Sequence, residues 1–461
     1  MSVVGAFIVP HPPLIVPQIG RGQEEVIQNT IDAYEEVGRR ISILKPDVIV
    51  ITTPHSVVYS DYFHISPGNL ASGDFSAFGS PNVRFSVQYA PDFVEKLNEI
   101  TQKEEINAGT QGERDSSLDH GTLVPLYFIN QYYREYKLVR VSISGLPFIT
   151  HYRFGQCIAA AARESKSRVV FVASGDLSHK LKADGPYGFA KEGPAFDRDV
   201  TDAMKTGDFL RFLNYEESFC EAAAECGLRS FIIMAGALDG KSVESELLSY
   251  EGPFGVGYAV AAFAVIGDDE NRRFGLRYEE LNDKRIIKAR RNEHEYVGLA
   301  RRSLEHYVKT RQYLQRPEGL SEDLINKKAG VFVSLKLDGQ LRGCIGTITP
   351  TTECVADEII RNAVSAGVRD PRFRFVEEQE LENLVYSVDV LGDTEVIDSI
   401  SKLDPKRYGV IVSSRGKTAL LLPNLEGIDT PEEQVNIALR KGGILPNEKY
   451  ELARFEVVRY E

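Results

Sequence analysis

Three of the eight histidines in this chain stand just after a run of apolar residues. Imidazole titrates near neutral pH and is the commonest side-chain metal ligand, so histidines delivered to one place suggest metal binding or proton transfer. For His11 the alternative is a surface histidine in a turn, because prolines surround it. The three are His11, His55 and His179, and the runs before them are 3–9, 47–53 and 168–173.

The apolar runs are typical of buried strands in a parallel sheet, which are apolar on both faces. Between the first two runs, residues 24–44 place apolar side chains at steps of three and four, which predicts a helix. A strand, helix and strand in this order make the two strands parallel, so their carboxyl ends share one edge of the sheet. Ligand sites of α/β sheets collect at that edge. The sequence therefore predicts an α/β domain in which His11 and His55 lie close together.

Other polar residues are placed to join this edge. His120 belongs to an Asp-His-Gly sequence before a predicted helix at 124–132, where the adjacent carboxylate can orient the imidazole. Glu225 precedes a predicted helix at 228–238, and Glu221 is close by. An acidic residue at that position can also act only on the helix dipole.

Two histidines and one carboxylate from separate elements form the facial triad that holds non-haem Fe(II) (Fe²⁺) and leaves positions open for substrate and O₂. His11, His55 and Glu225 fit the ligand roles, with Glu221 as the other candidate acid. Two neutral imidazoles and one carboxylate leave the ion with net positive charge, which stabilises a bound catecholate. His179 can take the second phenolic proton and return it, and His120 is a further acid/base or orienting group.

These motifs resemble those of a known family. Pro-His after the first run, Thr-Pro-His after the second, Asp-His-Gly, and Gly-Asp-Leu-Ser-His are similar to the class III (LigB-like) extradiol ring-cleavage dioxygenases, a family that includes the Memo-type proteins. The resemblance covers about residues 1–266 and implies that His11, His55 and a later glutamate hold Fe(II) and that His179 is the catalytic acid and base. A small catechol-like aromatic and O₂ are the implied substrates. Memo-type relatives are similar through Cys226-Gly227, so a non-oxygenating module that binds a metal, a ligand or a partner is the alternative.

The length of 461 residues favours two or three domains. We assign residues 1–267 to the dioxygenase-like domain, the charge-rich segment 268–284 to a linker, and 285–461 to a second domain. In the second domain the pattern predicts a helix over 292–310 and a hairpin that turns at Asp338-Gly339.

The second domain carries the heptad Leu-Arg-Gly-Cys-Ile-Gly-Thr at 341–347, which resembles the signature of the AMMECR1 domain. The resemblance extends over about 286–461 and implies an α+β fold without naming a reaction. Cys344 beside Arg342 is a candidate thiolate nucleophile, and the alternative is a small buried cysteine in a glycine-rich strand. A homo-oligomer, or a protein partner bound through this domain, is a further expectation.

Composition narrows the partners. A net charge of -13 disfavours nucleic acid and an anionic membrane surface. No apolar run reaches the roughly 18 to 20 residues of a membrane span, and we expect no secretion leader. Five cysteines without CxxC spacing indicate reduced thiols, so the sequence predicts a cytoplasmic protein. From the net charge and the lengths of the apolar runs we expect neither a nucleic-acid nor a membrane partner.

Overall fold

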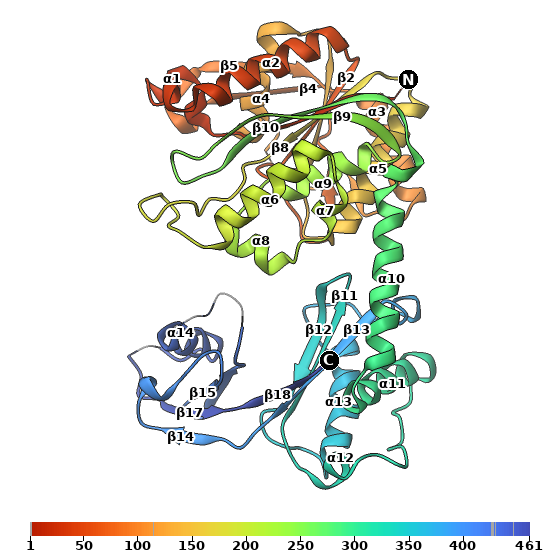
Figure 1. The fold of residues 1–461 in the computed structure, drawn as a ribbon, viewed down its shortest axis with the longest axis vertical. Coiled ribbons are helices and arrows are strands. Elements are labelled where there is room, and N and C mark those ends of the chain that lie inside the picture. The colour runs from red at the N-terminus through yellow and green to blue at the C-terminus, as the bar shows by residue number, and fades with distance from the viewer. Residues whose placement is uncertain (1, 114, 426–427, 429, 446) are drawn as a thin grey trace. The chain divides into compact units, whose positions relative to one another are not determined.

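A computed structural model describes residues 2–113, 115–425, 428, 430–445 and 447–461. The chain forms two compact units, Met1–Glu280 (unit 1) and Leu281–Glu461 (unit 2), and each is described by itself. The boundary falls inside helix α10 (Phe274–Asn292), labelled in Figure 1. The charged segment 268–284, expected to be a linker, is therefore helical from Phe274 onward.

Unit 1 is built on one mixed sheet. Its first four strands are mutually parallel, and the last two run antiparallel to their neighbours. The order across the sheet is β7 (Lys137–Ser142), β2 (Val48–Thr53), β8 (Val169–Ser174), β1 (Val3–Val9), β10 (Tyr258–Asp268) and β9 (Lys241–Glu251). The predicted parallel strands are thus confirmed, and β2, β8 and β1 are neighbours whose carboxyl ends share one edge.

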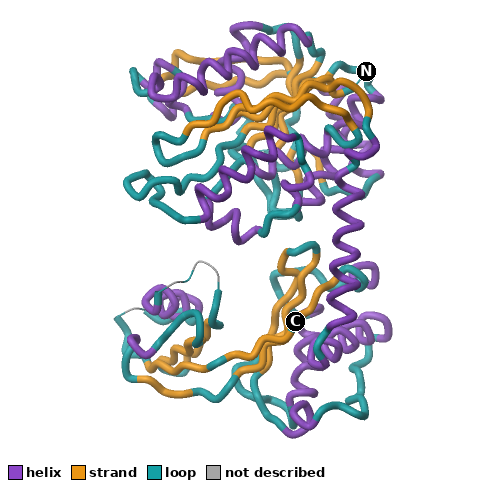
Figure 2. Tube along the Cα trace, viewed as in Figure 1, coloured by secondary structure: helices purple, strands orange, loops and turns teal. Residues whose placement is uncertain are grey.

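Helices cover both faces of this sheet (Figures 1 and 2). Successive side chains of a strand point to opposite faces, so Ala6 and Ile8 enter one apolar core while Phe7 and Val9 enter the other. Each large apolar side chain buried in this way contributes roughly 1.5–3 kcal/mol. One core holds α2 (Gln28–Leu44) and α4 (His120–Tyr132), and the other holds α3 (Pro91–Lys103), α5 (Phe148–Glu164), α6 (Glu192–Thr206) and α9 (Leu228–Ala237).

Shorter elements complete unit 1. The helix predicted from Glu24 begins at Gln28, after a 3-10 turn at Glu24–Ile27. The remaining short helices and strands are α1 (Pro17–Gly20), β3 (Phe63–His64), β4 (Leu70–Phe75), β5 (Ser80–Gln88), β6 (Ala108–Gly109), α7 (Leu210–Leu213) and α8 (Glu217–Ala223), with 3-10 turns at Pro13–Ile15, Ser76–Phe78 (η3) and Glu270–Arg272.

Unit 2 has two antiparallel sheets. One has the order β12 (Gln340–Gly346), β11 (Val331–Leu337), β13 (Leu384–Leu391) and β18 (Val457–Tyr460), and it packs on α11 (Glu295–Thr310), α12 (Glu322–Asn326) and α13 (Val355–Val368). The other has the order β14 (Glu395–Ile397), β17 (Glu451–Phe455), β15 (Gly409–Ser414) and β16 (Lys417–Leu421), and it packs on α14 (Pro431–Lys441). The predicted hairpin is confirmed: Leu337 pairs with Gln340, and both turn residues, Asp338 and Gly339, have positive φ.

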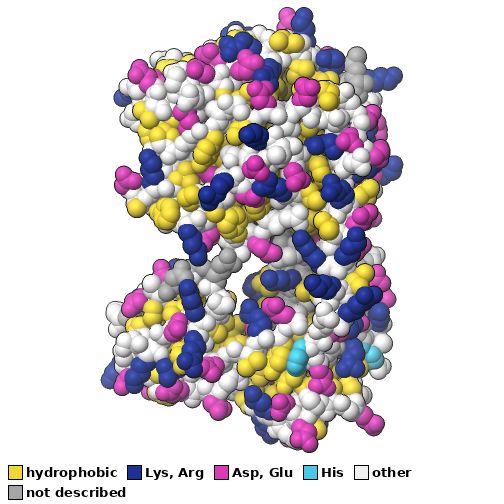
Figure 3. Space-filling view, in the orientation of Figure 1, with side chains coloured by type: hydrophobic (Ala, Val, Ile, Leu, Met, Phe, Trp, Pro, Cys, Tyr) yellow, Lys and Arg dark blue, Asp and Glu magenta, His cyan; other side chains and the backbone are white. Residues whose placement is uncertain are grey.

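Charged side chains of both signs spread over the face of the molecule shown in Figure 3. Within the ranges that the structure describes, none of the helices combines the length and the apolar character that a bilayer crossing requires.

Candidate metal centre

Three donor atoms from three separate elements converge beyond the carboxyl ends of the strands. The Nε2 atoms of His11 and His55 lie 2.9 Å apart, and the Sγ atom of Cys226 lies 3.6 Å from Nε2 of His11. All three atoms are within 4.8 Å of one another, and among the described residues this is the one group of three or more potential metal ligands. His11 follows β1, His55 follows β2, and Cys226 precedes α9. The predicted meeting of His11 and His55 therefore occurs in the structure.

The hydrogen bonds of His11 leave the lone pair of its Nε2 atom available to bind a cation. The hydroxyl of Ser174, at the end of β8, donates to the carbonyl of Gly121 at 2.6 Å. That hydroxyl must therefore accept the 3.0 Å bond to His11, so Nδ1 of His11 carries the proton and Nε2 has the lone pair. The backbone N–H of His11 donates to the carboxylate of Asp176 at 2.8 Å, which fixes the residue further.

His55 is held through Asp119. The hydroxyl of Thr53 accepts the backbone N–H of His55 at 3.1 Å and donates to Asp119 at 2.6 Å. Asp119 also accepts the backbone N–H of Thr122, so it is the N-cap of α4. The Asp-His-Gly sequence is thus a helix start, in which His120 is the first helical residue.

The third position of the cluster is taken by Cys226, where the sequence predicted Glu225 or Glu221. The Glu225 carboxylate accepts the backbone N–H of Leu228 at 2.6 Å, and Glu221 is exposed on α8. A close contact sets this geometry, since a Cβ atom on Gly175 would lie only 2.1 Å from Cα of Gly227. The end of β8 can therefore lie against the Cys226-Gly227 segment. The backbone N–H of Asp176 then donates to the sulfur of Cys226 at 3.3 Å.

The two other predicted histidines lie beside the cluster. The ring of His120 is 4.1 Å from that of His55 and 5.3 Å from that of His11, measured between centroids. Nδ1 of His179 contacts the carbonyl of Ala224 at 2.5 Å. A carbonyl only accepts, so Nδ1 of His179 carries the proton and its Nε2 remains an acceptor.

Burial sets the charge state of the cluster. Desolvation, followed by the charges of His55 and His120, lowers the pKa of His11 well below its usual range. Desolvation likewise lowers the pKa of His55 to about 4 and lowers the pKa of His120 and His179. It raises the pKa of the Cys226 thiol well above its ordinary value. The imidazoles are therefore neutral at neutral pH, and a bound cation would release the thiol proton.

This donor set fits a transition-metal ion. Two nitrogens each about 2.1 Å from one ion are about 3.0 Å apart when their bonds meet at right angles, close to the 2.9 Å between the His11 and His55 nitrogens. Imidazole suits iron, zinc and copper, and a thiolate adds preference for softer ions over Mg²⁺ or Ca²⁺. Asp176 is a further carboxylate nearby, 4.0 Å from Nε2 of His11, and burial raises its pKa to about 7.

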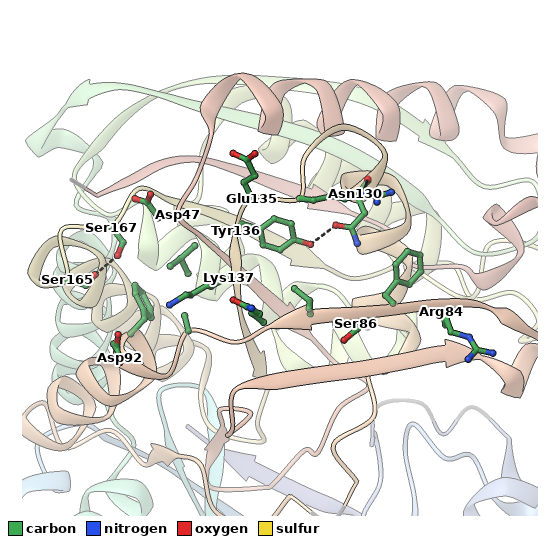
Figure 4. A pocket seen from close by; sticks show the side chains of 17 residues that line it. Asp47, Arg84, Ser86, Asp92, Asn130, Glu135, Tyr136, Lys137, Ser165 and Ser167 are labelled. Atoms are coloured by element: carbon green, nitrogen blue, oxygen red, sulfur yellow. Dashed lines mark hydrogen bonds between the residues drawn. The ribbon is translucent and has the colours of Figure 1, made fainter.

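A hollow of about 990 Å³ in unit 1 lies at the other end of the strands (Figure 4). Asp47 and Val48 border it at the start of β2, and Tyr136 and Lys137 at the start of β7. In Figure 4 the hydroxyl of Tyr136 donates to Asn130 at 2.9 Å. The hollow is thus separate from the histidine cluster, which follows the opposite strand ends.

Comparison with known proteins identifies the family. Residues 5–261 match the model of the catalytic LigB subunit of aromatic ring-opening dioxygenases. The chain belongs to the LigB family. Residues 297–461 match the AMMECR1 model, so a LigB domain is followed by an AMMECR1 domain, as predicted.

The chain has relatives over its whole length and over parts of it. Protein CA_C1420 of Clostridium acetobutylicum is 41% identical over 469 aligned residues, which span all of both chains. A Thermotoga maritima protein is 47% identical over 171 residues, which are 37% of this chain and 98% of its own length. The crystal structure of protein PH0010 from Pyrococcus horikoshii matches 36% of this chain and 88% of that chain, at 33% identity and a TM-score of 0.34.

Proposed function

We propose that the LigB domain holds Fe(II) through His11, His55 and Cys226 and brings a small catechol-like aromatic together with O₂ for ring opening. The observation that carries this proposal is the convergence of the three donor atoms at the strand ends of a LigB domain. When bound, Fe(II) would supply a Lewis-acidic, redox-active centre for the two substrates.

The charge of the donor set suits this substrate. Two neutral imidazoles and one thiolate leave a divalent ion with one net positive charge, as two imidazoles and one carboxylate would. Cys226 in place of the expected glutamate therefore preserves the attraction for a catecholate.

Two histidines are placed to handle the phenolic protons. His179 donates from Nδ1 to Ala224, so its Nε2 atom can accept a proton from a substrate hydroxyl and later return it. His120, beside His55, is the second acid/base group.

Aromatic side chains flank these two histidines. The ring of Tyr187 is 5.1 Å from that of His179, and the ring of Phe78 is 5.4 Å from that of His120. Both aromatic residues are partly exposed, Tyr187 at 60% and Phe78 at 39%. Such faces favour a planar aromatic substrate over an aliphatic one.

A second candidate is a Memo-like module that binds a metal, a ligand or a partner without oxygenating it. The observation that favours it is Cys226 itself, because a thiolate is oxidised by reactive oxygen species far more readily than a carboxylate.

One experiment separates the two functions. The full chain is purified without oxygen, loaded with Fe(II) and mixed with a panel of catechols, and O₂ uptake and ring-opened products are followed. The dioxygenase proposal expects one O₂ consumed per catechol and loss of turnover, with iron retained, in His179→Gln. Stoichiometric iron without O₂ uptake would favour the second candidate, and absence of both iron and O₂ uptake would overturn the dioxygenase proposal.

A further inference from the structure

Unit 2 contains a cavity of about 910 Å³. This volume is within the range of small-molecule sites, about 300–1,000 Å³. Its walls come from the sheet that contains β11–β13, from α10 and α11, from β16 with the segment after it, and from the end of α14. Many of the lining side chains are apolar: Phe332, Leu341, Ile345, Val385, Leu420 and Leu422. Leu341 and Val385 are 40% and 41% exposed, so apolar surface is available to a ligand.

The cavity is basic although the whole chain is acidic. Six basic and three acidic side chains line it, against a net charge of -13 for the chain. Arg372 is paired with Asp370, and Arg459 with Asp389. The amines of Lys336 and Lys441 form no ion pair or hydrogen bond with any residue in the described ranges. In Figure 3, Lys and Arg side chains gather on unit 2 around the place that β11–β13 occupy in Figure 1.

Two covered polar atoms in the cavity wall also lack partners among the described residues. They are the hydroxyl of Tyr386, a residue that is only 4% exposed, and Nε of Arg290. A buried polar atom without a hydrogen bond costs about 1–3 kcal/mol. The Tyr386 ring packs with Leu335 in the core on the α11 face of the sheet, whereas Lys336 and Val385 lie on the other face, so these two atoms are apart from the lysine side of the cavity.

Cys344 lies in the same wall and is held firmly. Its sulfur accepts the hydroxyl of Ser334 at 3.2 Å, its backbone N–H donates to Asp370 at 2.9 Å, and its carbonyl accepts from Arg372 at 3.3 Å. This thiol therefore reports on whatever enters the cavity.

We propose that this cavity binds a small organic anion, an apolar body carrying a carboxylate, with the body on the aliphatic walls and the carboxylate at Lys336 and Lys441. The charge complementarity and the unpaired amines support an anion, and the apolar walls support a hydrophobic body. This site lies wholly in unit 2 and is independent of the function proposed for the LigB domain.

Alkylation of Cys344 in the full chain tests the proposal. Rates with anionic iodoacetate and neutral iodoacetamide are measured by mass spectrometry of the Cys344 peptide and compared with those of free cysteine. We expect the protein to shift the ratio toward iodoacetate, and Lys336→Gln/Lys441→Gln to reduce that shift about threefold to tenfold. Lys309→Gln/Lys327→Gln removes two exposed charges outside the cavity and is expected to leave the ratio unchanged.

Ligand probes complete the test. Decanoate and 2-naphthoate represent aliphatic and aromatic carboxylates, and decanol and 2-naphthalenemethanol are their neutral counterparts. The proposal is supported if either carboxylate slows the alkylation of Cys344 and its alcohol slows it less. The carboxylate with the stronger effect then shows whether the cavity prefers an aliphatic or an aromatic ligand. Equal protection by acid and alcohol, or none by any probe, would overturn it. Calorimetric titration of the unmodified protein and of the lysine variants with decanoate and 2-naphthoate measures carboxylate affinity without relying on the thiol.

Discussion

The first prediction is that Cys226, and not Glu225, is the third ligand of the proposed metal site. The sulfur of Cys226 lies 3.6 Å from Nε2 of His11, whereas the neighbouring Glu225 carboxylate is bonded to the N–H of Leu228. We therefore expect Cys226→Ser to lose metal and Glu225→Gln to keep it.

The expected magnitudes differ clearly. Removing a residue that hydrogen-bonds to a metal ligand, without binding the metal itself, typically weakens metal affinity by about 10- to 100-fold. Loss of a direct ligand is thus expected to cost at least about 100-fold, which is about 2.7 kcal/mol. In Glu225→Gln the amide oxygen can still accept from Leu228, so we expect metal affinity within about threefold and a stability change below about 1 kcal/mol.

The assay is anaerobic titration of the full chain with Co²⁺ and Fe²⁺, in which a near-ultraviolet sulfur-to-metal absorption band reports a thiolate ligand. Cys344→Ser, a cysteine in unit 2, is the matched control and is expected to bind metal normally. Normal metal binding in Cys226→Ser together with its loss in Glu225→Gln would refute the assignment.

Three further predictions concern the groups that hold the two sites. Gly175→Ala places a methyl group 2.1 Å from Cα of Gly227, so we expect about 1–3 kcal/mol of destabilisation and at least tenfold weaker Fe(II) binding. The control is Gly267→Ala, whose added Cβ meets nothing within 4 Å and which is expected to leave stability and Fe(II) affinity unchanged. Equal metal affinity in the two variants would contradict this account. Asp119→Ala removes the N-cap of α4 and the support of His55, so thermal melting is expected to show a loss of about 1–2 kcal/mol with weaker metal binding, and Asp119→Asn is expected to recover most of the stability. The hydrogen bond from Arg372 is the main reason that the pKa of Asp370 is lowered from 3.8 to about 2. The stabilisation by Asp370 is then complete above pH 3.8 and is lost as the pH falls toward 2. In denaturant titrations Asp370→Asn is therefore expected to lower the free energy of unfolding by about 1–2 kcal/mol at pH 7 and by much less at pH 2. A loss of stability that does not change with pH would argue against this prediction.

The sequence alone was sufficient for the parts of the fold that follow local patterns. Apolar runs separated by helical periodicity predicted the parallel strands, and parallel strands share an edge, so the meeting of His11 and His55 followed from the pattern. The Asp338-Gly339 turn was predictable for the same reason, since two residues with positive φ suit a tight hairpin.

The third member of the candidate metal site, Cys226, depended on tertiary structure. Glu225 and Cys226 are adjacent, and a sequence pattern cannot say which of two neighbouring side chains points inward. The Cys-Gly pair was the available signal, and its physical basis is the contact between Gly175 and Gly227, which are far apart in the chain. The sequence also could not predict which ring nitrogen of His11 carries the proton, because Ser174 and Gly121, from two other elements, determine it.

What the sequence determined by itself was therefore which residues reach the edge of the sheet, since strand direction and periodicity are local properties. What only the tertiary structure decided was which atoms face one another there. Side-chain direction depends on contacts between segments distant in sequence. Gly175 lies against Gly227 beside the candidate metal site, and Lys336 and Lys441 line one cavity in the AMMECR1 domain.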